Sequence, residues 1–141
     1  MTKGMRVDGV ESERGSIEVH RLRRGLLRST VHGHIDLAIL SVLTRTRDAE
    51  AELCPNGLAY FHDWTGAVGY DSQVRVEATR YMLAVPKPYT HVHIVTQSRI
   101  ANMGVAAAAL SLQLAGRPFH AYITPASFER EFERQCSLRY S

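Results

Sequence analysis

Residues 58–73 read LAYFHDWTGAVGYDSQ, and this stretch decides the fold. Its first part, 58–62, is almost wholly apolar and predicts a central strand, because a strand covered on both faces shows no polar alternation. Residues 63–70 include two glycines and are expected to form a loop. A helix is expected to begin near Asp71 or Ser72, since either side chain can accept a hydrogen bond from the free N–H groups of the first turn.

Two strands and a helix are predicted before this stretch. Residues 17–22 alternate apolar with polar side chains, and residues 26–32 return after a turn, which indicates a hairpin. Residues 34–53 carry apolar side chains at helical spacing. The polar residues 1–15 lack an apolar core, so we expect a flexible leader followed by one folded domain over residues 16–141.

After residue 73 the chain alternates between helices and strands. A strand is expected over 91–96, a helix rich in small residues over 101–115, a strand over 119–123, and a final helix opened by Thr124-Pro125. The predicted order is ββαβαβαβα. Because strands joined through helices favour right-handed parallel crossovers, the fold class is α/β, with a single mixed or parallel sheet and covering helices.

Composition excludes several classes of protein. The chain has 141 residues, enough for one core, and two cysteines, too few for a disulfide framework, so a cytoplasmic location is expected. No apolar run is long enough to insert in a membrane. The net charge is +3, and many of the basic residues that supply it lie beside one turn. No aromatic residues are interleaved with them, so no nucleic-acid partner is expected.

The sequence also lacks the common signatures of enzymes. There is no Gly-rich phosphate loop, no dinucleotide-binding fingerprint and no nucleophile elbow, so we predict no catalytic residues and no cofactor. Two histidine pairs, His32 with His34 and His91 with His93, could each hold a metal ion if His62, Asp63 or His120 supplied a third ligand from an adjacent strand. No carboxylate stands at a fixed spacing from them, so no metal is predicted, and a metal-dependent enzyme is kept as a third hypothesis.

The remaining candidates follow the central strand, where parallel α/β sheets place their sites. The predicted partner-binding residues are Asp63, Trp64, Tyr70, Asp71, Ser72, Gln73 and Arg75. The two aromatic residues either anchor a partner or pack over the end of the sheet. A phosphate on Ser72 would meet free N–H groups at the helix start, and a simple helix cap is the alternative.

The order of elements resembles the STAS family, named for sulfate transporters and anti-sigma factor antagonists. The resemblance runs from about residue 17 to about 138 and includes the strand-to-helix turn at 31–36, the central strand ending at Asp63, the Asp-Ser step at 71–72 and the turn at 96–98. It implies a protein that binds an anti-sigma factor or a kinase-like regulator and is switched by phosphorylation of a serine at the helix start.

This chain departs from that motif in places. Ser72 matches the first serine of the family motif, but Gln73 stands at the position usually phosphorylated and Val74 replaces a glycine. The longer stretch before the helix is similar to divergent members grouped with lipid-binding Sec14-type domains.

The resulting expectation is a non-enzymatic STAS-like module that recognises a protein through residues 63–75. The alternative is a small-ligand or lipid carrier with a pocket between the sheet and the helix at 101–115. A homodimer through that helix or a sheet edge stays open.

Overall fold

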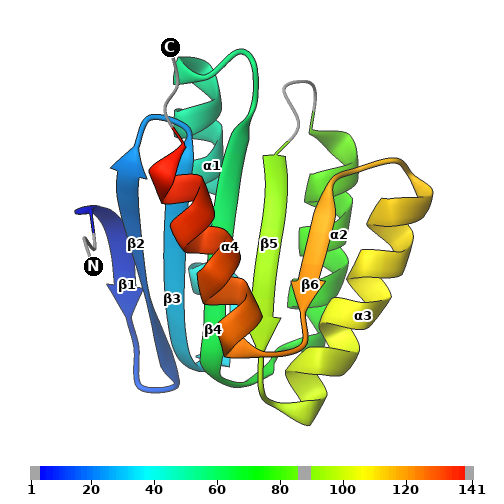
Figure 1. Ribbon diagram of the computed structural model, residues 1–141. Coiled ribbons are helices and arrows are strands. Elements are labelled where there is room, and N and C mark those ends of the chain that lie inside the picture. The colour runs from blue at the N-terminus through cyan, green and yellow to red at the C-terminus, as the bar shows by residue number, and fades with distance from the viewer. Residues whose placement is uncertain (1–3, 86–89, 139–141) are drawn as a thin grey trace.

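Six strands in the described part of the chain form one sheet, and their order across the sheet is their order in the sequence (Figure 1). The structure is a computed structural model, and it describes residues 4–85 and 90–138. The strands are β1 (Met5–Glu11), β2 (Gly15–Arg23), β3 (Leu26–Ile35), β4 (Leu58–Tyr70), β5 (Thr90–Thr96) and β6 (Phe119–Tyr122). The helices are α1 (Leu37–Leu53), α2 (Ser72–Ala84), α3 (Arg99–Leu114) and α4 (Pro125–Ser137).

The sheet is mixed, as predicted. Strands β1, β2 and β3 pair antiparallel, and β3 through β6 pair parallel. The hairpin between β2 and β3 turns at Gly25, whose φ of 83° lies in the left-handed region that favours glycine. Each parallel step is made through a helix, so the crossovers inferred from the alternation of elements are present.

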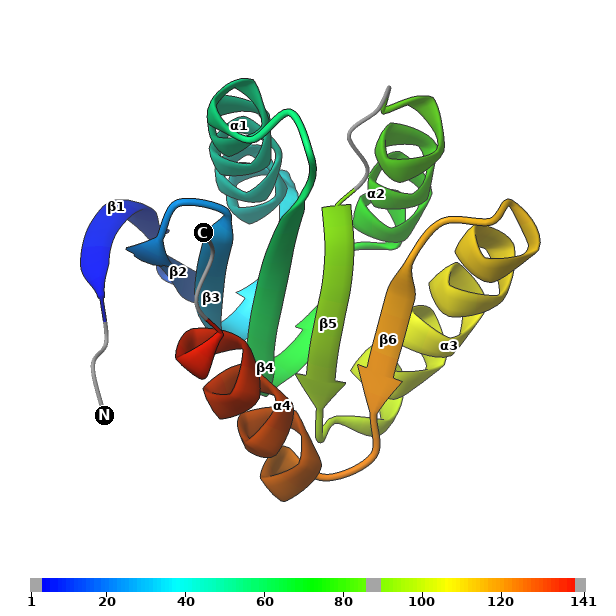
Figure 2. The same cartoon turned by 45° about the horizontal axis from the view of Figure 1, so that its top comes forward.

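Three helices cover one face of the sheet and α4 covers the other (Figure 2). Side chains along β4 alternate between these faces: Tyr60 belongs to the core beneath α1, whereas Phe61 packs with Phe128 and Phe132 of α4. No helix among the described residues is both long and apolar enough to cross a bilayer.

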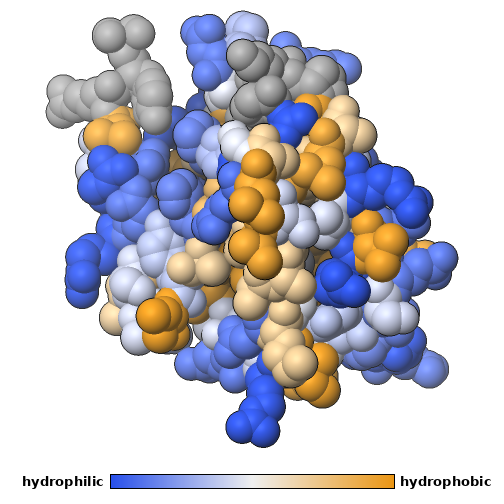
Figure 3. All heavy atoms as spheres, turned by 90° about the vertical axis from the view of Figure 1, so that its right-hand side faces the viewer, coloured by the Kyte–Doolittle hydropathy of each residue, from blue (hydrophilic) through white to orange (hydrophobic). Residues whose placement is uncertain are grey.

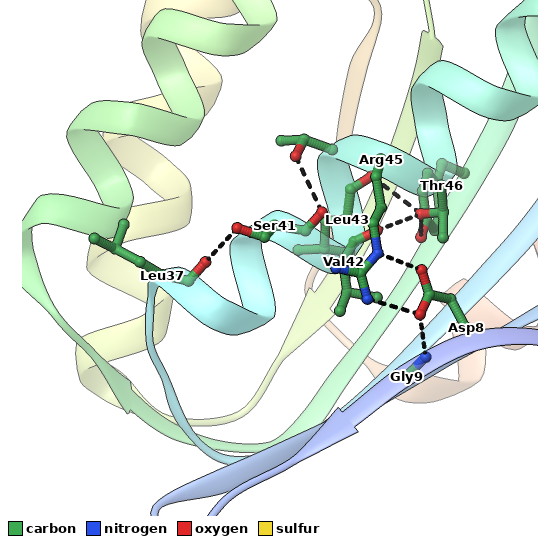
Figure 4. Close-up of polar contacts among 10 residues, drawn as sticks. Asp8, Gly9, Leu37, Ser41, Val42, Leu43, Arg45 and Thr46 are labelled. Atoms are coloured by element: carbon green, nitrogen blue, oxygen red, sulfur yellow. Dashed lines mark hydrogen bonds and ion pairs between the residues drawn. The ribbon is translucent and has the colours of Figure 1, made fainter.

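The expected leader contains a strand, which corrects the prediction of a flexible segment over residues 1–15. Strand β1 pairs with β2, and its residue Val10 packs against the core. Arg45 of α1 donates to both carboxylate oxygens of Asp8, at 2.6 and 2.8 Å, and so ties this edge to the helix (Figure 4). An edge strand with exposed side chains carries no regular apolar pattern, so the sequence of β1 does not predict a strand. Residues 1–3 lie outside the described residues.

The predicted loop at 63–70 is also a strand, because β4 continues to Tyr70. Its pairing with β3 shifts register twice, and each shift inserts one extra residue on β4. A Cβ on Gly66 would collide with His32 Nδ1 and would lie 3.0 Å from the carbonyl oxygen of Val31. The glycine therefore allows a bulged strand to pass close to its neighbour, and it does not mark a loop.

Candidate functional site

The start of α2 is held by an ionic cluster. Asp71, the N-cap residue, has its Oδ1 atom 2.6 Å from His34 Nε2 and accepts a hydrogen bond of 3.3 Å from Arg14 Nη2. The hydrogen bond from His34 lowers the pKa of Asp71, and the charge of Arg14 acts in the same direction. These contacts draw the carboxylate away from the helix, so Asp71 makes no side-chain cap, contrary to the sequence-based expectation.

The residues that follow Asp71 face solvent. Ser72, Gln73 and Arg75 are exposed, and the exposed Val76 follows them. Val68, near the end of β4, is 64% exposed. We call these five residues the α2-start surface. It combines two apolar side chains with a hydroxyl, an amide and a guanidinium, the mixture found where proteins recognise one another.

Asp63 does not belong to this surface. Its side chain accepts a hydrogen bond of 3.0 Å from Arg28 Nη2, and Arg28 also pairs with Glu129 of α4. Arg28 lies over the ring of Phe132, with the guanidinium carbon 4.5 Å from the ring centroid. Asp63 therefore lies on the α4 side of the sheet, where it helps to hold that helix in place.

Trp64 and Tyr70 lie in β4 and are half-buried, so the exposed loop expected to carry them is absent. Trp64 packs against the core and donates a hydrogen bond of 3.2 Å from Nε1 to Ser29 Oγ. Tyr70 packs beside α3 at Gly104, where a Cβ atom would come within 2.7 Å of the phenol oxygen. Both aromatic side chains thus fill the space between the sheet and its helices.

A cavity of about 140 Å³ lies between the sheet and helices α1, α2 and α3. The walls of the cavity are mostly apolar side chains of β4, β5, α2 and α3, and the lining includes His62, Trp64, Ile94, Met82, Ala108 and Leu112. Helix α2, which is described in full, has one buried residue, Val74. The sequence-based alternative expected a pocket between the sheet and the helix at 101–115, and a cavity is found there.

His62 is a buried histidine in the wall of this cavity. The residue is 9% exposed, and its Nδ1 atom lies 2.7 Å from Ser29 Oγ. Burial, together with a smaller effect of the nearby His93, lowers the pKa of His62 to about 3. The imidazole is therefore neutral at pH 7. The sequence marks His62 only as one of three candidates for a third metal ligand, because its buried environment depends on Ser29 of the neighbouring strand.

The two histidine pairs are dispersed in the structure. His34 contacts Asp71, and His93 stacks on Phe61 with its Nδ1 atom 2.8 Å from the hydroxyl of Tyr122. Within residues 4–85 and 90–138, no three His, Cys, Asp or Glu side chains gather in a way that could hold a metal ion. Both cysteines are free thiols.

Helix α3 presents an apolar face to solvent. Its large exposed apolar residues are Ile100, Met103, Leu110 and Leu114. Figure 3 looks onto the side of the molecule where α3 lies, and apolar side chains gather along the middle of this face. Their spacing, with exposed Ala107 between Met103 and Leu110, alternates steps of three and four residues, as in a helix that packs against another helix.

The fold and the position of the helix starts define a known class of domain. This sheet order, with three helices on one face, is the STAS fold that the sequence predicted. A solved structure, an anti-sigma factor antagonist from Mycobacterium paratuberculosis, aligns with a TM-score of 0.57 and 15% identity, over 84% of this chain and 94% of that chain. No model of a protein family matches the sequence, and no curated protein does.

Proposed function

We propose that this chain is a non-enzymatic regulatory module that binds another protein through the α2-start surface. The observation that carries the proposal is the exposure of Ser72, Gln73, Arg75 and Val76 in the first turns of α2, together with that of Val68 near the end of the preceding strand. Exposed apolar side chains ringed by polar groups are typical of protein interfaces. The solved structure with the same fold is described as an anti-sigma factor antagonist, a protein that acts on another protein.

In this proposal the parts of the surface have different roles. Val68, 64% exposed, and Val76, 44% exposed, supply the apolar contact area. Ser72, Gln73 and Arg75 supply direction through hydrogen bonds and charge. Trp64 and Tyr70, first considered as anchors, support the surface from behind, because their rings pack between the sheet and its helices.

Ser72 is the residue at which the interaction would be switched. Its hydroxyl is exposed at the first position of α2, and the side chain of the N-cap residue Asp71 does not cap the N–H groups of that turn. A phosphate there would meet these N–H groups and the nearby Arg75, but it would also be repelled by Asp71. The partner class that fits is an anti-sigma factor or a kinase-like regulator in the cytoplasm, which is the partner that the family resemblance implies.

Site-specific photo-crosslinking in the native cell tests the proposal. A photoreactive phenylalanine analogue replaces Gln73 on the α2-start surface, and the matched control places it at Arg130, an exposed residue of α4 on the opposite face. We expect a discrete crosslinked protein from position 73 that is lost when Arg75→Glu is added. Equal crosslinking from both positions, or none from position 73, would refute the proposal.

A further inference from the structure

The cavity beneath α2 has a mostly apolar wall that also includes several polar side chains. One of them, His62, ends a buried series of hydrogen bonds that begins at Trp64 and passes through Ser29. Ser29 is completely buried, so each of its hydrogen-bonding positions needs a partner within the protein. Which atom donates in each of these hydrogen bonds decides whether Nε2 of His62 carries a hydrogen.

The direction follows from the number of hydrogens available. The indole Nε1–H of Trp64 is a donor only, so Ser29 Oγ accepts that hydrogen bond. Among the described residues, the one acceptor left for the Ser29 hydroxyl hydrogen is Nδ1 of His62, at 2.7 Å. A neutral imidazole that accepts at Nδ1 carries its hydrogen on Nε2. We therefore assign the Nε2–H tautomer to His62.

The Nε2–H group of His62 is left without a partner in the described part of the chain, where Ser29 is the one group hydrogen-bonded to the ring. The rings of Tyr60 and Trp64 flank the imidazole, with centroids 4.4 and 5.4 Å away, and neither supplies an acceptor. The hydroxyl of Tyr60 is already paired with Thr46. A donor of this kind, on a residue that is 9% exposed in the wall of the cavity, stabilises an acceptor atom placed opposite it.

We propose that this cavity is a binding site for a small, uncharged apolar molecule, of about the size of a substituted benzene ring, whose single acceptor oxygen binds His62 Nε2–H. The volume of about 140 Å³ fits this class, since an apolar cavity of ~150 Å³ binds benzene. The small side chain of Ala108 on α3 leaves room for the ring. Helix α2 buries Val74 alone, so it can move to admit the ligand.

An uncharged ligand fits better than an anion. Two cationic side chains line the wall. Arg47 is itself 6% exposed and donates to Thr90 Oγ1 at 2.7 Å and to Asp48, so its charge is already held by the protein. Arg75 is exposed at the start of α2, where solvent screens its charge. A carboxylate placed near His62 would be buried against a neutral ring, and burial of an unpaired charge is costly.

The test compares two ligands of matched shape by NMR titration of the ¹⁵N-labelled chain. Acetophenone carries a carbonyl oxygen, and α-methylstyrene replaces that oxygen with a CH₂ group. We expect both to shift the signals of Ala108 and the Trp64 indole, with acetophenone binding about fivefold more tightly, as one neutral hydrogen bond predicts. A long-range ¹H–¹⁵N spectrum reads the tautomer of His62 directly, and we expect the hydrogen on Nε2.

Two variants of adjacent alanines locate the site. Ala108→Phe fills the cavity and is expected to abolish binding of acetophenone, whereas Ala107→Phe, on the exposed side of α3, is expected to retain it. If Ala108→Phe fails to fold, the ligand pair and the tautomer in the unmodified chain still decide. Equal affinity for the two ligands, no binding of either, the Nδ1–H tautomer, or tighter binding of benzoate than of acetophenone would each overturn the proposal.

Discussion

Acidification is predicted to destabilise the protein through His62. In the unfolded chain a histidine has a pKa of about 6.5, whereas burial holds the pKa of His62 in the fold at about 3. Between these values the unfolded chain takes up a proton that the folded chain does not bind, so the free energy of unfolding falls as the pH falls. From pH 6.5 to pH 5 this amounts to about 2 kcal/mol for His62.

Other groups act in the same direction with different weight. His93 has its pKa lowered to about 4 by burial and then by His120, and it adds a smaller loss because solvent screens it in part. Asp8 and Glu131 have lowered pKa values, so their contributions are lost at more acidic pH. The window between pH 6.5 and 5 therefore reports mainly on the buried histidines.

Urea unfolding at pH 7, 6 and 5, followed by the fluorescence of the single tryptophan Trp64, measures this effect. His62→Gln is the comparison, because an amide can still hydrogen-bond to Ser29 but does not titrate. We expect the variant to lose about 2 kcal/mol less than the unmodified chain between pH 7 and pH 5. The same pH dependence in both proteins would refute the assignment of a buried, neutral His62.

Three further predictions concern packing and assembly. Arg28→Met is expected to cost about 2 kcal/mol in urea unfolding, because it leaves Glu129 and its neighbouring carboxylate without their cation; a loss near zero would contradict this. Gly66→Ala is expected to lower the Tm, because its Cβ would collide with the ring of His32, and an unchanged Tm would show that the bulge adapts. If the chain forms the homodimer considered from the sequence, Leu110→Glu on the apolar face of α3 should yield a monomer in sedimentation without loss of Tm, and a dimer that persists would exclude α3 as the interface.

Much of the fold could be predicted because its signals are local. The helical spacing in 34–53, the hairpin turn at Gly25 and the Thr124-Pro125 helix start each depend on a few adjacent residues, and each is found in the structure. Strand β1 was missed because its stability comes from distant partners, the pairing with β2 and the ion pair between Asp8 and Arg45. A polar edge strand carries no periodic signal of its own.

The candidate site was predictable only in part. The predicted helix start is found, and it brings Ser72, Gln73 and Arg75 into the first turns of α2, while their role in binding stays a prediction. Asp63 was grouped with them by its place in the sequence, although alternation along a strand places it on the opposite side of the sheet from His62. The small residues of α3 did indicate a pocket.

The central claim, that a protein partner binds at the start of α2, is tested most directly by hydrogen–deuterium exchange. Backbone amides are compared between the chain alone and the chain bound to the protein that crosslinks to position 73. We expect slower amide exchange at residues 72–76 in the complex and unchanged amide exchange in α4. Slower exchange confined to α3 or α4, with residues 72–76 unaffected, would contradict it.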